Sequence, residues 1–321
     1  MEIGIDDDER DFLRKQGLII TEIIARGGFG TILKVYSTLY KSEFAIKKVP
    51  ETSFDFKEIE CIKSIDDPRI VSLYSYFHYK GFYYMLMEYC VTDLERIVRD
   101  GSRISREEMF KYIQGIVLSV KACHDRNIAH CDIKPSNFML DQYGRVKVGD
   151  FGLATLLLVD EGNRKIKGTR YFMAPEVITQ KEYDFMKADI WAIGVTLYYL
   201  TTLTYPFYAN DQDSLFSLII KGSYRIDRIS DPMLRHVILK CLETNPNDRP
   251  TIDQLIEMPY FKRGSSSSSE KVLSQAATKI IKPRVSSRKP KRYRSGVFSP
   301  SENQRVMSYL EMLKSSDSVI V

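Results

Sequence analysis

The sequence predicts an α+β fold in which a strand-rich first third is followed by a mainly helical remainder. β-Branched segments separated by glycines and short turns fill residues 18–90. Apolar residues at helical spacing dominate from about residue 93 to residue 261. The chain has 321 residues, of which 44% are hydrophobic. That is enough for a large core, in one domain of two lobes or in two domains.

The first third contains five expected strands and one expected helix. LIITEIIA and TILKVYS flank the glycine turn RGGFG, and EFAIKKV is a further strand. A helix is expected over Phe54–Ile65, because Ile59, Ile62 and Ile65 have helical spacing. RIVSLYSYF and FYYMLMEYC form a strand pair that turns at Lys80-Gly81.

The remainder is predicted to be helical. SREEMFKYIQGIVLSVKACHD begins with Ser105 and Glu108 at capping-box spacing, which predicts a long helix. KADIWAIGVTLYYLTT is apolar on all sides, so we expect it to be buried. After residue 261 comes GSSSSSE, and residues 264–321 are predicted to be a Ser-rich linker and a basic, mostly disordered tail with a possible short helix at 301–314.

The positive charge belongs to the tail. The net charge is +5, yet residues 264–321 contain 11 Lys and Arg against four Asp and Glu, which leaves 36 basic and 38 acidic residues before them. The core therefore offers no basic face for nucleic acid. The tail could be a nuclear import signal, a regulatory segment or a solvated polybasic stretch, so a regulatory partner or import receptor is one expectation.

Cysteine use and hydropathy suggest the compartment. The five cysteines are odd in number and none shows CxxC spacing, so reduced thiols are expected. The acidic N-terminus lacks an apolar signal core, and the longest apolar run is too short to span a bilayer. We expect a soluble protein of the cytoplasm, with the nucleus as an alternative.

Five short motifs occur in one order: RGGFG, AIK, HCDIKPSN, DFG and APE. This set resembles the eukaryotic-type protein kinase family, Ser/Thr-specific, over residues 18–261. The resemblance implies the two-lobed protein kinase fold. Its N-lobe, an antiparallel β-sheet with the αC helix, would span about 18–89, and its mainly α-helical C-lobe about 93–261. Calcium/calmodulin-type features are present, but they leave the subfamily undecided.

The resemblance assigns catalytic roles. Asp132 would accept the proton of the attacking hydroxyl, and Lys134 would steady the transferring phosphoryl group. Asn137 and Asp150 offer the oxygen ligands that Mg²⁺ prefers. Thr169 would contact Asp132 and Lys134.

The resemblance also assigns supporting roles to several residues, and we expect these roles to be mainly structural. Glu176 would pair with Arg249, because a buried charge needs a partner. Asp189 would anchor the backbone of the catalytic loop, and His130 would be a packed core residue.

ATP would be held by the glycine turn, by Lys47 and by apolar side chains. Lys47 would grip the α- and β-phosphates and pair with Glu58 of the expected helix. One glycine of the family pattern is replaced, because its three positions fall on Ala25, Gly27 and Gly30. The other implied nucleotide contacts are Ile32, Ala45, Met87, Glu88, Cys90, Met139 and Asp150.

The residue before Asp132 departs from the family pattern. Most Ser/Thr kinases have arginine there, and it binds a phosphate on the activation loop, which Cys131 cannot do. Between Asp150 and Glu176 the only Ser or Thr residues are Thr155 and Thr169. One interpretation is that activity does not depend on activation-loop phosphorylation. The alternative, with equal support, is that Cys131 is a neutral substitution.

The implied function is transfer of the γ-phosphate of ATP, with Mg²⁺, to serine or threonine of protein substrates. A catalytically weak pseudokinase that binds ATP as a scaffold is the main alternative, because of Ala25 and Cys131. A small-molecule kinase is a second, but the GTRYFMAPE segment favours peptide substrates.

Overall fold

The computed structural model describes residues 5–27, 30–101, 103–156, 169–179 and 182–262. Two compact units are distinguished among them. The first holds residues 5–55 and 72–89, and the second holds the other described residues. The predicted tail at 264–321 and its possible short helix lie outside the described residues.

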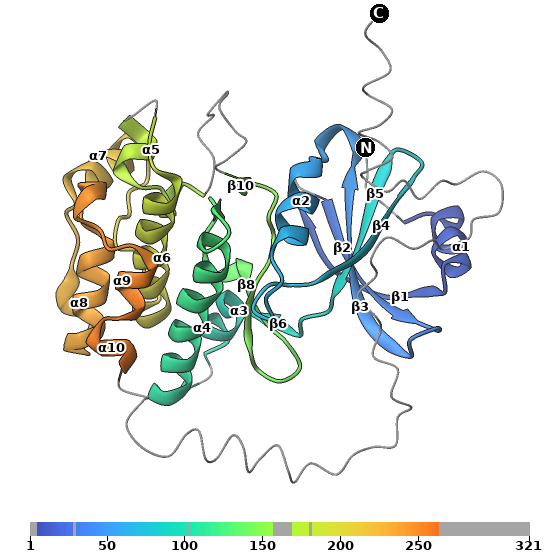
Figure 1. Ribbon diagram of the computed structural model, residues 1–321, viewed down its shortest axis with the longest axis horizontal. Coiled ribbons are helices and arrows are strands. Elements are labelled where there is room, and N and C mark those ends of the chain that lie inside the picture. The colour runs from blue at the N-terminus through green and yellow to red at the C-terminus, as the bar shows by residue number, and fades with distance from the viewer. Residues whose placement is uncertain (1–4, 28–29, 102, 157–168, 180–181, 263–321) are drawn as a thin grey trace, which may run out of the picture. The chain divides into compact units, whose positions relative to one another are not determined.

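The first unit is an antiparallel five-stranded sheet with one helix against it. The strand order is β1-β2-β3-β5-β4 (Figure 1). The helix α1 spans Asp7–Lys15 and is followed by β1 (Leu18–Gly27), β2 (Gly30–Ser37), β3 (Ser42–Pro50), the short 3-10 helix Glu51–Ser53, β4 (Leu73–Tyr79) and β5 (Phe82–Glu88). The predicted strands are confirmed, except that the fourth begins at Leu73 and does not include residues 69–72. The turn at Lys80-Gly81 is also confirmed, with φ of 46° and 75° at these two residues.

The register of this sheet separates its two faces. Ile32 pairs with Lys47, and Ala45 pairs with Met87. Paired residues of antiparallel strands share a face, and residues two apart along a strand do too. These four predicted nucleotide contacts therefore share one face. The opposite face is a buried apolar cluster that includes Leu33, Val35, Phe44, Ile46 and Leu86.

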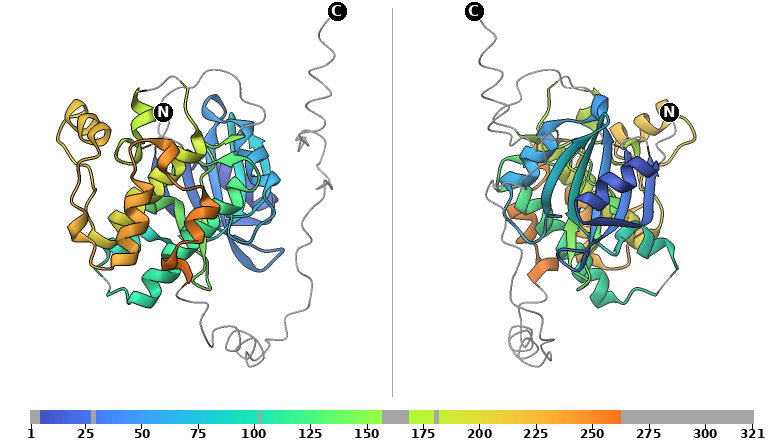
Figure 2. Two further views of the ribbon diagram at one scale, coloured as in Figure 1. Left: turned by 60° about the vertical axis from the view of Figure 1, so that its left-hand side comes forward. Right: turned by 90° about the vertical axis from the view of Figure 1, so that its right-hand side faces the viewer.

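Helix α1 is not among the predicted elements, although the acidic residues before Phe12 are typical of a helix start. Asp6 caps the helix by accepting a hydrogen bond of 2.7 Å from the amide of Glu9. Acidic residues fill its first turn and basic residues its last. Phe12 and Leu13 are buried in the apolar cluster. The right-hand view of Figure 2 shows α1 across this face of the sheet.

The second unit is mainly helical. Its helices are α2 (Phe56–Ser64), α3 (Leu94–Arg99), α4 (Arg106–His124), α5 (Pro175–Thr179), α6 (Phe185–Thr202), α7 (Gln212–Lys221), α8 (Pro232–Cys241), α9 (Ile252–Ile256) and α10 (Pro259–Lys262). The predicted capping box is present, since Ser105 and Glu108 exchange hydrogen bonds at the start of α4. Most residues of α6 are buried, as its uniform apolarity predicted. No described helix is long and apolar enough to cross a membrane.

Two small sheets of the second unit carry the motif residues. β6 (Thr92–Asp93), β8 (Phe138–Leu140) and β9 (Val146–Val148) form one sheet, and β7 (Ile128–Ala129) pairs with β10 (Thr155–Leu156) in the other. The hairpin of β8 and β9 turns at Asp141 and has Asn137 before its first strand and Asp150 after its second. It therefore brings the two predicted magnesium ligands to one end.

Candidate active site

The loop from His130 to Asn137 is held from beneath by one carboxylate. Asp189 of α6 accepts hydrogen bonds from the backbone amides of His130 at 2.8 Å and Cys131 at 2.9 Å. It accepts a third from the Nε2 of His124 at 3.0 Å. The predicted anchoring by Asp189 is thus present, and His124 is a partner that the sequence analysis did not name. Three donors on one buried carboxylate fix the loop's path.

Cys131 has a backbone conformation that few residues other than glycine adopt. Its φ is 63°, in the left-handed region where Cβ crowds the backbone. The hydrogen bond from its amide to Asp189 holds this strained turn in place. The backbone of Cys131 therefore forms the turn that positions Asp132, and this role does not depend on the Cys131 side chain.

His130 is fully buried and links two motifs. Its Nδ1 accepts a hydrogen bond of 3.3 Å from the amide of Asp132. Its Nε2 then carries the proton and donates to the carbonyl of Gly149 at 3.0 Å. The ring packs 5.0 Å from Phe151, centroid to centroid. His130 is thus a core residue that ties the catalytic loop to the DFG segment.

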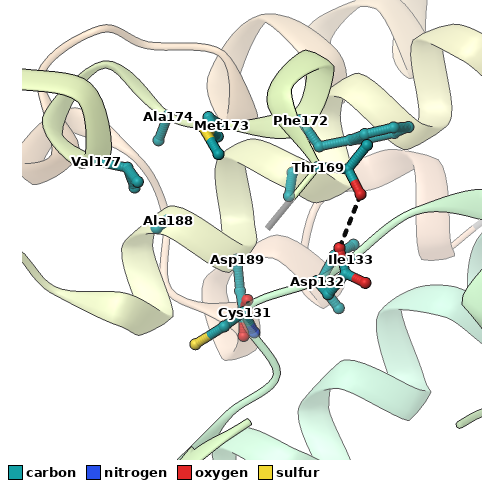
Figure 3. A pocket seen from close by; sticks show the side chains of 11 residues that line it. Cys131, Asp132, Ile133, Thr169, Phe172, Met173, Ala174, Val177, Ala188 and Asp189 are labelled. Atoms are coloured by element: carbon teal, nitrogen blue, oxygen red, sulfur yellow. Dashed lines mark hydrogen bonds between the residues drawn. The ribbon is translucent and has the colours of Figure 1, made fainter. Parts of the chain in front are cut away.

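Asp132, Lys134 and Thr169 form a triangle of side chains. The Nζ of Lys134 lies 2.6 Å from Oδ2 of Asp132 and donates to the hydroxyl of Thr169 at 3.2 Å. That hydroxyl donates to Oδ1 of Asp132 at 3.0 Å, as Figure 3 shows. The predicted contacts of Thr169 are therefore present. The triangle places a carboxylate and an ammonium next to each other in a partly exposed site.

A hollow of about 30 Å³ lies beside this triangle. Its walls include Asp132, Ile133, Thr169, Met173 and Ala192 (Figure 3). The hollow is large enough for a water molecule. It is lined by residues of both the loop that contains Asp132 and the segment that begins at Thr169.

Asn137 joins the site through its amide nitrogen. This nitrogen donates to the backbone oxygen of Asp132 at 2.8 Å and to its carboxylate at 3.1 Å. The amide oxygen of Asn137 thus remains the atom suited to a cation. The backbone amide of Gly149 donates to the carbonyl of Asn137 at 3.0 Å, which brings Asp150 to the same end of the hairpin. Two hard oxygen donors at one point fit a Mg²⁺ site that phosphate oxygens and water would complete.

No described cluster of three or more His, Cys, Asp or Glu side chains is arranged to hold a metal ion. Asp150 adopts a φ of 59°, so its backbone is also in the left-handed region. Such a conformation stores local strain and is found mainly where a side chain must be aimed.

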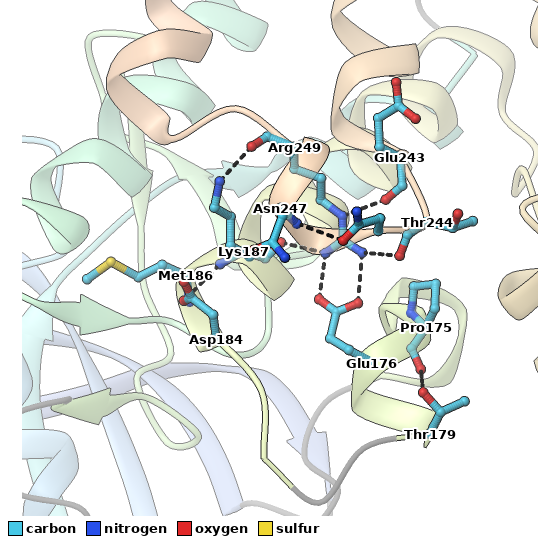
Figure 4. Close-up of polar contacts among 11 residues, drawn as sticks. Pro175, Glu176, Thr179, Asp184, Met186, Lys187, Glu243, Thr244, Asn247 and Arg249 are labelled. Atoms are coloured by element: carbon cyan, nitrogen blue, oxygen red, sulfur yellow. Dashed lines mark hydrogen bonds and ion pairs between the residues drawn. The ribbon is translucent and has the colours of Figure 1, made fainter.

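Arg249 and Glu176 form the predicted ion pair, and both side chains are buried. Further hydrogen bonds from the guanidinium reach the backbone carbonyls of Glu243, Lys187 and Thr244. Figure 4 shows this network around the start of α5. The network fixes the end of the segment that begins at Thr169.

The predicted nucleotide residues belong to both units. In the first unit Ala25 pairs with Ile32, which pairs with Lys47. Gly30 packs against the backbone of β3, because a Cβ there would lie 2.1 Å from the carbonyl oxygen of Lys48. Gly27 is described too, while residues 28 and 29 of the turn lie outside the described residues.

The structure also describes the other predicted nucleotide contacts and the predicted partners Lys47 and Glu58. Glu88 ends β5 in the first unit, and its amide donates to the carbonyl of Ser72 at 2.9 Å. Cys90 and Met139 belong to the second unit, where Met139 lies in β8. Lys47 and Glu58 are both buried and belong to different units. Their pairing stays a prediction.

A stack of tyrosines beside Thr169 was missed by the sequence analysis. The ring of Tyr171 lies 4.5 Å from that of Tyr205 and 6.2 Å from that of Tyr208, nearly parallel to both. Tyr208 is 62% exposed. Burial raises the pKa of Tyr205, so its phenol stays neutral. The spacing of these residues in the sequence gave no periodic signal, since one comes from the segment after Thr169 and two from the loop after α6.

Comparison with known families decides the class. The protein kinase domain family matches residues 18–261. The chain belongs to the protein kinase family. The antiparallel sheet of the first unit and the helices of the second are those of the kinase fold that the motifs predicted.

The kinase relatives include plant and animal proteins. CBL-interacting serine/threonine-protein kinase 18 of Arabidopsis thaliana is 36% identical over 212 residues, which are 65% of this chain and 41% of that protein. Sperm motility kinase 2B of Mus musculus is 30% identical over 252 residues, which are 77% of this chain and 52% of that protein. The chain thus spans about half the length of the curated relatives that it matches.

Proposed function

We propose that the chain is a protein serine/threonine kinase that transfers the γ-phosphate of ATP to hydroxyl groups of protein substrates. The triangle of Asp132, Lys134 and Thr169 carries this proposal. A carboxylate and an ammonium in contact are what phosphoryl transfer to a hydroxyl needs. One accepts the proton and the other balances charge on the phosphoryl oxygens.

Each residue of the site has one task in this proposal. Asp132 orients the substrate hydroxyl and accepts its proton at a carboxylate oxygen. Lys134 stands beside the same carboxylate and faces the transferred group. Asn137 and Asp150 would hold Mg²⁺, which when bound with ATP neutralises phosphate charge. Lys47 would bind the α- and β-phosphates, and the apolar residues of its face of the sheet would contact the adenine.

Protein rather than small-molecule substrates are supported by the tyrosine stack beside Thr169. Tyr171 and Tyr208 offer partly exposed aromatic surface next to the hydroxyl acceptor site, and such surface suits residues that flank an acceptor in a peptide. A Tyr171→Ala variant should raise the KM for peptide and leave the KM for ATP unchanged. Tyr143→Ala, an exposed tyrosine in the turn after β8, is the matched control.

Transfer from Mg·ATP to a Ser/Thr peptide library tests the proposal, with Asp132→Asn as the inactive comparison. Loss of a general base costs about 10²- to 10⁴-fold. If wild type and variant both bind ATP and neither transfers phosphate, the ATP-binding scaffold is the better description.

We also propose that activity does not require a phosphate on the activation segment. The neutral Cys131, whose strained backbone is held by Asp189, supports this, because a phosphate would find no cation at that position. Phosphatase treatment should leave activity unchanged. Loss of activity that maps to residues 153–173 would contradict this part of the proposal.

For the basic tail we propose a regulatory partner or an import receptor, and a location in the cytoplasm or nucleus. The excess of Lys and Arg in residues 264–321 supports this. Fluorescent fusions with and without residues 283–294 test it. A distribution that is the same for both fusions argues against an import signal.

A further inference from the structure

Arg170 places a positive charge directly beside the triangle of Asp132, Lys134 and Thr169. It follows Thr169 in the chain, and the Thr169 hydroxyl is hydrogen-bonded to Asp132 at 3.0 Å and to Lys134 at 3.2 Å. Arg170 also begins a short 3-10 helix, and its carbonyl accepts a hydrogen bond of 3.4 Å from the amide of Met173. The backbone of Arg170 is therefore held next to the place where the proposed reaction occurs.

The charge of Arg170 is not compensated by the described part of the chain. Its side chain is exposed and makes no hydrogen bond, ion pair or ring contact with any described residue. Two nearby cations differ in this respect. Lys134 has Asp132 as a partner at 2.6 Å, and Arg99 of α3 has Glu95 at 3.5 Å. Because a guanidinium can bind a carboxylate through two nitrogens, Arg170 offers a charge that fits an acidic side chain.

The tyrosine stack continues the surface from Arg170. Tyr171, the next residue, lies with its ring 4.5 Å from that of Tyr205, and the Tyr199 ring follows 4.9 Å from Tyr205. At this far side Arg99 donates to the Tyr199 hydroxyl at 3.1 Å. Arg170 thus lies between the triangle and the stack along the chain. An extended peptide advances about 3.3–3.6 Å per residue, so a substrate residue about one to three positions from the acceptor comes within reach of Arg170.

We propose that Arg170 is a specificity-determining residue that selects substrates with an acidic side chain close to the acceptor hydroxyl. Its guanidinium binds the carboxylate of an Asp or Glu in the substrate and repels a Lys or Arg at the same position. The substrate class is therefore a protein segment in which a Ser or Thr has an acidic neighbour. This inference rests on the proposed function, because it concerns the substrate of that reaction.

An Arg170 that only supports the segment after Thr169 would behave differently. Its replacement would lower the stability of the protein, or change the turnover of all peptides by the same factor. Selection by charge makes the stricter demand that the effect of the replacement depends on the charge of the substrate.

The experiment uses the full chain and acceptor peptides that differ at a single position. Asp, Asn or Lys is placed in turn at each of about three positions on either side of one serine. The ratios of kcat/KM for Asp, Asn and Lys peptides are measured for wild type, Arg170→Gln and Arg170→Glu, and thermal unfolding gives stability. Arg126→Glu is the matched control, because Arg126 is exposed in the turn after α4 and has no described contact with the triangle.

We expect the wild type to prefer Asp over Asn at least about threefold at one or more positions, as an exposed ion pair allows. The position also shows on which side of the acceptor Arg170 acts. Arg170→Gln should bring this ratio close to one, and Arg170→Glu should favour Lys over Asn. Arg126→Glu should keep the wild-type ratios. The wild-type preference should weaken as salt is raised from about 0.05 M to about 0.5 M, because exposed charges are screened.

A wild type that shows no preference for Asp at any of these positions overturns the inference, as does a preference that persists in Arg170→Gln. Arg170→Gln alone serves if Arg170→Glu does not fold. If the wild type phosphorylates no peptide, the proposed function fails, and fluorescence anisotropy then tests the inference separately. The probes are labelled Asp and Asn peptides in which alanine replaces the serine. Tighter binding of the Asp peptide that is lost in Arg170→Gln would still support selection by Arg170, and equal binding of both peptides would refute it.

Discussion

Two guanidinium nitrogens of Arg249 donate to the two carboxylate oxygens of Glu176, at 2.6 and 2.7 Å, and the side chains are 0% and 1% exposed. Replacing Arg249 by Met leaves the Glu176 carboxylate buried without its partner. We expect a loss of about 3–5 kcal/mol in the free energy of unfolding. Urea unfolding followed by circular dichroism measures it.

Two comparisons sharpen this prediction. Lys240→Met removes a half-exposed ion pair with Glu243, and such surface pairs contribute at most about 1 kcal/mol. Adding Glu176→Leu to Arg249→Met should recover part of the loss. If the single variant loses less than the Lys240 control, burial of the charge is not what stabilises the segment.

The Thr169 hydroxyl is hydrogen-bonded to both Asp132 and Lys134, so under the proposed function it should be needed for turnover. Thr169→Ala leaves Asp132 and Lys134 each without one hydrogen bond. Hydrogen bonds to charged groups contribute about 1.5–3 kcal/mol, which corresponds to roughly 10- to 150-fold in kcat/KM. Thr169→Ser retains the hydroxyl and should stay within a few fold of wild type. Equal loss in both variants would assign the effect to the methyl group instead.

Gly30 and Gly27 should differ in their tolerance of a methyl group. At Gly30 a Cβ would meet the Lys48 carbonyl, and the backbone φ of 127° disfavours other residues. At Gly27 a Cβ would meet no atom of the described residues within 4 Å. Gly30→Ala should therefore cost about 1–3 kcal/mol of stability, whereas Gly27→Ala should cost less than about 1 kcal/mol. Thermal or urea unfolding of both variants gives the comparison.

Asp141 should make stability depend on pH in the acid range. Burial would raise its pKa, but hydrogen bonds from the amides of Arg145 and Tyr143 and from the Arg145 guanidinium outweigh it, so the pKa is lowered. A lowered pKa means that this stabilisation is complete above the unfolded value of about 3.9 and is lost as pH falls through the folded value. Asp141→Asn should cost about 1 kcal/mol at pH 7 and flatten the acid limb of the stability profile.

Stability measured from pH 2 to pH 7 checks this. Glu22→Gln, at an exposed position of β1, is the control. A variant profile parallel to that of the wild type below pH 4 would show that Asp141 titrates no differently when folded.

Local sequence patterns predicted most of the secondary structure. The strands around RGGFG, the turn at Lys80-Gly81 and the capping box of α4 were all readable, because each depends on neighbours in the sequence. Helix α1 was missed although its signals were present, with Asp6 at the cap and an acidic first turn. A nine-residue helix is marginal alone, so its presence depended on distant strands that the pattern does not name.

The candidate site also has features that the sequence predicts and features that it does not. The sequence motifs predict that Asp132, Lys134, Asn137 and Thr169 belong to one site. They could not show that the amide nitrogen of Asn137 binds Asp132, or that Tyr171 meets Tyr205 and Tyr208. These contacts depend on how separate segments pack, and side-chain packing leaves no periodic trace in one sequence.

The docked helix α1 has a consequence for synthesis of the chain. It is the first described element to leave the ribosome, but its partners come much later: Lys48 follows Glu9 by 39 residues and Lys80 follows Asp8 by 72. Until β5 emerges, the cluster that Phe12 and Leu13 join lacks Tyr84 and Leu86. Helix α1 is thus made before all of the residues that it packs against, and the nascent chain exposes Phe12 and Leu13 until the cluster is complete.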